Sequence, residues 1–257
     1  MRTRIALVAL TSALLVAGVL AGEHKGDDDS KLDKKVLEIV KQVGDLHKNA
    51  KSLHVDVALT GSGEQGGEKR KFDSEVIFDL EQPNHLAVRS HNKHDKNADL
   101  TLVCDGKALL AYAAKAKHYI QTEAPSDLHE MGATLFRLGR RNTGMLFVNV
   151  LAADPYEQLM DGVNSCSYAG KEKIGDVEAH HLKFSQDQFD WEMWVAAEGK
   201  PVVVKMTSTR SGDNGKFIVE ELYRNWKLDT PPGKEVFAFS PPKDATKVDN
   251  LEDDIDK

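Results

Sequence analysis

A period of two in the placement of apolar side chains dominates this 257-residue chain. Apolar residues occupy every second position from Leu53 to Leu59, and a similar alternation returns from Phe72 to Leu80. Alternation of this kind places one row of side chains on each face of a half-buried strand. The glycine-rich stretch 61–68 between the two runs predicts a turn or loop. Further short strands fit residues 85–91, 99–104, 107–112, 117–122, 163–174, 177–185, 189–196, 201–209 and 216–227.

Helical patterns are few beside these ten or so predicted strands. An apolar stripe over residues 32–46 predicts a leading helix capped by Ser30. A second helical pattern starts at Pro125 and a third at Asp154, with the apolar run 145–151 between them. A long antiparallel sheet with so little helical cover must curl upon itself. We therefore predict an α+β fold, with one large curled antiparallel sheet and helices covering its concave face.

Residues 1–21 have the three parts of a secretory signal peptide. A positively charged start precedes an apolar run, and Val19 and Ala21 are the small residues expected before cleavage at Gly22. The apolar run is slightly short for a spanning helix, which favours cleavage over a membrane anchor. We expect a periplasmic or secreted protein with no transmembrane anchor after cleavage.

The mature chain reads as one domain between two polar ends. Residues 22–31 predict a flexible acidic leader, residues 32–248 the domain, and residues 249–257 an acidic tail. Without the two arginines of the signal peptide, the chain carries 32 basic and 41 acidic residues, a net charge of −9. No excess of positive charge is available to follow a phosphate backbone, so we expect no nucleic-acid partner. We expect a monomer.

The apolar strand faces identify candidate ligand-binding residues. Stripes of large apolar side chains are most often ordinary core. A curled sheet plugged by short apolar helices also leaves an apolar cavity, the usual form of a small-molecule site. We predict that such a cavity is lined by Val76, Phe78, Leu135, Phe147, Leu151, Trp191 and Met193.

Two cysteines, Cys104 and Cys166, fall in predicted strands. An oxidising compartment permits a disulfide between them. Two separate buried thiols, which behave as small hydrophobic groups, are the alternative.

Histidine and nucleophile patterns do not indicate catalysis. His91 and His94 lie in a polar, lysine-containing stretch, and the adjacent His180 and His181 point to opposite faces of a strand. A zinc site needs three or four convergent ligands, so we predict no metal site and no cofactor. Neither a G-x-S-x-G nor an H-E-x-x-H motif is present. We expect no catalytic residues and a protein that is not an enzyme.

Two distinctive motifs of this chain are D-W-x-x-W within 187–195 and the F-x-F-x-P-P ending at Pro242. With them, roughly residues 32–248 resemble an uncharacterised family of predicted bacterial periplasmic proteins. That family resembles the LolA/LolB-like lipoprotein carriers. The resemblance implies an incomplete antiparallel β-barrel with helices plugging its concave face and acyl chains bound in the cavity. No motif here matches the receptor-docking residues of those carriers. Other matching segments are Asp154–Tyr156, Tyr168–Gly170, His181–Phe184, Gly199–Pro201 and Trp226.

Three functions fit this sequence. The first, which we predict, is a carrier or chaperone that binds a lipid, an acyl chain or a lipoprotein in a cavity open to solvent. The second is a sensor or protein-interaction module, which requires a filled core and an exposed patch. The third is a hydrolase, which requires convergent polar groups inside the pocket.

Removal of the signal peptide should leave Gly22 as the first residue of the exported protein. N-terminal sequencing of that protein checks this expectation. A chain that still begins at Met1 and stays in the membrane would reverse the predicted localisation.

Overall fold

The computed structural model describes residues 31–65, 68–95, 99–131, 152–187, 189–212, 215–249 and 251. Helix α1 (Lys34–Asn49) precedes a first group of six strands, and helix α4 (Pro155–Met160) precedes a second group of five. The first group comprises β1 (Ser52–Gln65), β2 (Glu68–Glu81), β3 (His85–Asn92), β4 (Leu100–Asp105), β5 (Ala108–Ala113) and β6 (His118–Glu123). The second comprises β7 (Val163–Ile174), β8 (Val177–Gln186), β9 (Phe189–Ala196), β10 (Val203–Gly212) and β11 (Gly215–Leu228), followed by the 3₁₀ helix η3 (Lys234–Phe237) and β12 (Thr246–Lys247).

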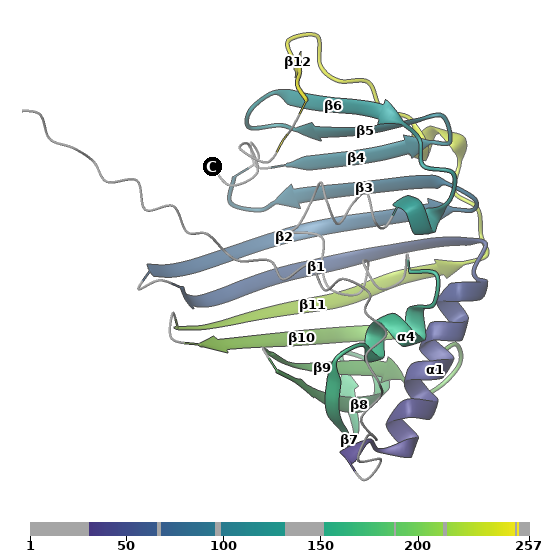
Figure 1. Cartoon of the computed structure of the whole chain (residues 1–257), viewed down its shortest axis with the longest axis vertical. Helices are drawn as coiled ribbons and strands as arrows, with labels where there is room; N and C mark the ends of the chain where they lie inside the picture. The colour runs from purple at the N-terminus through teal and green to yellow at the C-terminus, as the bar shows by residue number, and fades with distance from the viewer. Residues whose placement is uncertain are drawn as a thin grey trace, which may run out of the picture.

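These strands form one sheet in the order β12-β6-β5-β4-β3-β2-β1-β11-β10-β9-β8-β7. Each group is a meander, and the pairing of β1 with β11 joins the two. Neighbouring strands are antiparallel except that β12 runs parallel to β6. Figure 1 shows β1 to β6 side by side, with β7 to β9 turned out of their plane beside α1. The α+β fold with a large curled sheet that is not closed into a barrel is therefore confirmed.

The turn or loop predicted for residues 61–68 is wrong for residues 61–65. These residues extend strand β1, whose pairing with β2 continues to Gln65 opposite Glu68. A Cβ atom on Gly61 would lie 2.1 Å from Cε1 of Phe72, so the ring occupies the space that a side chain would need. Glycine here allows a close cross-strand contact and does not mark the end of the strand.

One face of the sheet carries the main core. Register aligns Leu53 with Leu80 and Val57 with Val76, so that their side chains share a face. The apolar stripe of α1 packs against this face, which we call the concave face. The stripe consists of Val36, Ile39, Val40 and Val43, each at most 7% exposed.

The two helices begin at carboxylate caps. The N-cap of α1 is Asp33, which accepts a hydrogen bond from Lys35 N, and is not the predicted Ser30. The predicted cap of α4 is confirmed, since Asp154 accepts a hydrogen bond from Glu157 N.

The F-x-F-x-P-P ending packs on the opposite face of the sheet. Phe237 is 3% exposed and lies against Ala87 and Val103. Arg89 Nη2 donates a hydrogen bond to the Val236 carbonyl oxygen at 2.6 Å and fixes this segment to β3. The motif therefore has a structural role here.

The disulfide considered between Cys104 and Cys166 does not form. Both residues are free, buried thiols. Cys104 lies in β4 and Cys166 in β7, and seven strands separate β4 from β7 in the sheet. A disulfide requires the two Cα atoms to lie within about 7 Å of each other. Burial raises the pKa of both thiols, which keeps them protonated and unreactive.

Gly44 allows α1 and α4 to approach closely. A Cβ atom at this position would lie 2.9 Å from both the backbone nitrogen and the Cβ atom of Tyr156. The Lys48 ammonium also forms a 2.8 Å ion pair with the cap Asp154 across the same helix contact. The two helices thus form one unit at the edge of the sheet.

Replacing Gly44 by alanine should lower the free energy of unfolding by about 1–2 kcal/mol, because the methyl group forces the helices apart. In a helix without such a close neighbour, replacing glycine by alanine would instead raise the free energy of unfolding by about 1 kcal/mol. Urea unfolding measures the difference, and Gln42→Ala on the exposed side of α1 is the matched control. A Gly44→Ala protein as stable as the wild type would contradict the close packing.

Candidate functional site

The structure brings four predicted site residues onto the concave face. Val76 and Phe78 lie in β2, and Trp191 and Met193 lie in β9, all at most 2% exposed. Trp191 stacks on Phe184 with ring centroids 3.7 Å apart. Their role as ligand contacts stays a prediction. The other three predicted residues, Leu135, Phe147 and Leu151, lie outside the described residues.

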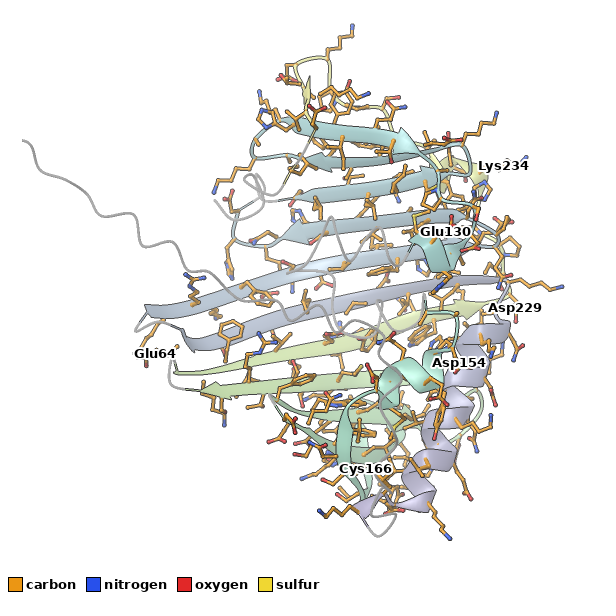
Figure 2. The ribbon with its side chains drawn as sticks, in the orientation of Figure 1. Glu64, Glu130, Asp154, Cys166, Asp229 and Lys234 are labelled. Carbon is orange, nitrogen blue, oxygen red and sulfur yellow. The ribbon has the colours of Figure 1, made fainter. Side chains whose placement is uncertain are left out.

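A cavity of about 240 Å³ lies at the rim of the concave face, where β1 begins and β2 ends. None of the four residues above contributes to its wall. In Figure 2 the labelled Glu130 and Asp154 lie at this end of the sheet, opposite the end that carries Glu64. The wall is formed by Leu53, Leu80, Leu128, Ala50, Pro83, Ala152 and Ala153 together with the polar residues His47, Lys48, Gln82, Asp127 and His129.

His47 is the buried polar residue of this wall. Its side chain belongs to the last turn of α1, is 5% exposed, and packs against the Trp226 ring with centroids 5.7 Å apart. Neither imidazole nitrogen makes a hydrogen bond of good geometry with another described group. A buried polar group without a partner costs about 1–3 kcal/mol of stability.

Burial is the larger cause and lowers the pKa of His47 to about 4, while the Val43 carbonyl one turn earlier acts in the opposite direction. The imidazole is therefore uncharged at neutral pH. A neutral imidazole offers one N–H donor and one nitrogen acceptor. The cavity wall thus contains a donor and an acceptor, neither of which makes a hydrogen bond of good geometry with a described group.

The charged groups around the cavity are paired or capped. The Lys48–Asp154 ion pair raises the pKa of Lys48 and lowers that of Asp154. Asp127 accepts a 2.8 Å hydrogen bond from Glu130 N, at the start of the helical residues 128–131. The wall therefore presents a partnered cation and a carboxylate, and no concentration of positive charge.

Four other histidines, His54, His91, His180 and His181, differ from His47 in having side-chain partners. His54 Nδ1 lies 2.7 Å from an Asp79 carboxylate oxygen, and His91 contacts Asp99. His180 and His181 point to opposite faces, as predicted: His180 contacts the Tyr168 hydroxyl, whereas His181 lies between Glu172 and Glu192. Among the described residues, no group of three or more His, Cys, Asp or Glu side chains is placed to hold a metal ion.

The sequence analysis missed His47 although a signal was available. The apolar stripe of α1 continues from Val43 to position 47, one helical turn later, and not to the half-buried Leu46. A histidine in a row of buried aliphatic residues is the feature that identifies it. The cavity itself forms where the start of β1, the end of β2 and residues 127–129 and 152–153 meet. No local sequence pattern specifies this meeting point.

Acid should destabilise the protein through His47. An unfolded histidine has a pKa of about 6.5, so the unfolded chain takes up a proton that the folded chain refuses as pH falls from about 6.5 to about 4. The free energy of unfolding falls by up to about 3 kcal/mol over this pH range, and it returns to its full value above pH 6.5. Urea unfolding between pH 7 and 4.5 measures this effect as the difference in pH dependence between the unfolding free energies of wild type and His47→Leu. Carboxylates such as Asp105 and Asp154 titrate in both proteins and cancel. Equal pH slopes for the two proteins would show that His47 is not held neutral by burial.

Solved structures similar to this chain are distant in sequence. An uncharacterized conserved protein from Thermus thermophilus is 13% identical, with a TM-score of 0.46 over 84% of this chain and 99% of that one. The Mycobacterium tuberculosis lipoprotein LppX is 13% identical, with a TM-score of 0.42 over 78% of this chain and 98% of that one. A LolA superfamily protein from Nitrosomonas europaea is 12% identical, with a TM-score of 0.35 over 79% and 96%. At this distance, ligands and partners of those proteins do not transfer to this chain. No curated protein matches the chain in sequence.

A family model described as "Predicted periplasmic protein (DUF2092)" matches residues 37–251, most of the chain. Its description confirms the periplasmic or secreted localisation and the family resemblance predicted from the sequence. No helix in the described part of the chain is long and apolar enough to cross a membrane. The chain belongs to the DUF2092 family of predicted periplasmic proteins.

Proposed function

We propose that this protein binds an apolar ligand, a lipid or acyl chain, on the concave side of its sheet and acts as a carrier or chaperone in the periplasm. The observation that carries the proposal is the continuity of the rim cavity with the apolar face. Leu53 and Leu80 form part of the cavity wall and are also the first pair in the apolar rows of β1 and β2. An acyl chain bound at the rim would therefore contact the ends of these two apolar rows.

Hydrophobic burial supplies the affinity in this proposal. An acyl chain gains about 0.8 kcal/mol for each CH₂ group that it buries. The periplasm is aqueous, and exposure of an acyl chain to water is unfavourable. A periplasmic protein that buries such a chain would therefore shield it from water. Since apolar contacts hold the chain, its affinity is expected to depend little on salt.

The proposed role includes no catalytic step. Nucleophilic catalysis requires a nucleophile hydrogen-bonded to a base. His47, the buried polar side chain of the described wall, has no such neighbour. The polar groups of the wall are assigned to binding.

A protein-interaction module on the same fold is less well supported. Such a module needs a contiguous exposed apolar patch. The exposed large hydrophobic residues of the described chain, Ile77, Val177 and Ile218, sit on three different strands. Singly exposed residues are normal on any protein surface.

Filling the rim cavity should weaken ligand binding. Ala152 is half-buried in the cavity wall, so Ala152→Phe places a ring in the space. We expect about tenfold weaker binding of a fluorescent fatty-acid analogue, the equivalent of roughly two excluded CH₂ groups. The matched control is Ala116→Phe, a half-buried position in the turn between β5 and β6, which should bind as wild type does.

Mass spectrometry of organic extracts of the purified protein provides an independent check, since a carrier is expected to co-purify with lipid. The carrier function fails if no lipid co-purifies and the fatty-acid analogue shows no saturable binding. The interaction module would then replace it.

A further inference from the structure

We propose that the rim cavity binds the uncharged, hydroxyl-bearing end of an acyl lipid, with His47 as the residue that hydrogen-bonds it. This inference rests on the proposed function and specifies which end of the ligand the cavity receives. It assigns a binding residue that none of the predicted apolar contacts includes.

The environment of His47 leaves its hydrogen-bonding groups available to a ligand. The side chain is 5% exposed, forms part of the cavity wall, and has two unpartnered nitrogens. Its aromatic neighbour cannot satisfy them, because Trp226 Nε1 already donates a 2.8 Å hydrogen bond to the Val203 carbonyl oxygen. Buried polar atoms in folded proteins are nearly always hydrogen-bonded, so an unpaired pair beside a cavity points to a bound partner.

The size of the cavity suits a headgroup and not a whole lipid. Its volume of about 240 Å³ lies below the roughly 300–1,000 Å³ of pockets that enclose drug-sized ligands. It corresponds to about eight water molecules at roughly 30 Å³ each, a space on the scale of a glyceryl group. The rest of such a ligand would extend past Leu53 and Leu80 on to the apolar face.

The chemistry of the wall favours a hydroxyl group over an anion. A hydroxyl group can either accept from the N–H of a neutral imidazole or donate to its bare nitrogen, and a group with two hydroxyls can supply a partner to each. An ionised carboxylate or phosphate only accepts. The Lys48 ammonium is already paired with Asp154, and the Asp127 carboxylate in the wall repels an anion. A glyceryl or sugar hydroxyl shares the required chemistry.

Competition between two lipids with the same acyl chain tests this assignment. Displacement of an environment-sensitive alkyl dye from the mature protein at pH 7 measures the affinities of 1-monooleoylglycerol and of oleate. We expect wild type to prefer monooleoylglycerol by about tenfold, the effect of one well-made hydrogen bond. His47→Leu should abolish this preference and leave the affinity for oleate unchanged. His47→Gln, which keeps a donor and an acceptor, should retain most of it.

His85 is the matched control. Its Nδ1 is also buried without a partner, but the ring packs on Phe237 at the opposite face and lies outside the cavity. His85→Leu should therefore keep the wild-type preference. Imidazole ¹⁵N shifts of His47 in the wild-type protein give a readout that needs no variant, since monooleoylglycerol should move them and oleate should not.

The outcomes separate this inference from the proposed function. If both lipids displace the dye equally, or if His47→Leu keeps the preference, the carrier function stands and the hydroxyl site is wrong. If neither lipid displaces the dye, both proposals fail. Unchanged His47 shifts on saturation with monooleoylglycerol would also overturn the site, because the cavity would then hold water only.

Discussion

The pairing of β1 with β11 is the contact on which the rest of the molecule depends. It joins the β1–β6 meander to the β7–β11 meander. It also aligns Leu53 with Leu228, although these residues lie near opposite ends of the domain in the sequence. A slip of one residue in either strand would move every apolar side chain of one meander to the wrong face. The register irregularity between His54 and Asp56 is an extra residue in β11, where Asn225 and Trp226 lie opposite the single residue Val55 of β1. The single apolar face, and the cavity at its rim, exist only in this register.

The edges of the open sheet determine where α1 lies. Leu32 bridges to Cys166, and Asp33 Oδ2 accepts a hydrogen bond from Tyr168 N, so the residues before α1 occupy part of the free edge of β7. Unpaired strand edges otherwise invite association with other chains. Anchored there, α1 lays its apolar stripe over the concave face and ends at the start of β1. Edge protection and the placement of His47 therefore come from one arrangement.

The sequence predicted the strands well, because alternation over six or more residues is a local signal. It does not depend on which strands pair in the sheet. The sequence also placed Val76, Phe78, Trp191 and Met193 on one buried face. The glycines of β1 were misread, because their role is a close contact with Phe72 that depends on register. The separation of Cys104 and Cys166, and the cavity, follow from the order of strands across the sheet, which local patterns do not contain. Three predicted cavity residues lie outside the described chain, and their role stays a prediction.

His47 shows how a site can oppose the stability of the fold that carries it. A leucine at position 47 would complete the apolar stripe of α1, whereas the imidazole leaves two buried nitrogens unpaired. Local choices that disagree with the packing around them are expected at functional sites. Burial also determines the chemistry of the group, because exclusion of water keeps the ring neutral and so keeps both a donor and an acceptor. In the site that we propose, burial of this imidazole would favour an uncharged polar group over an anion.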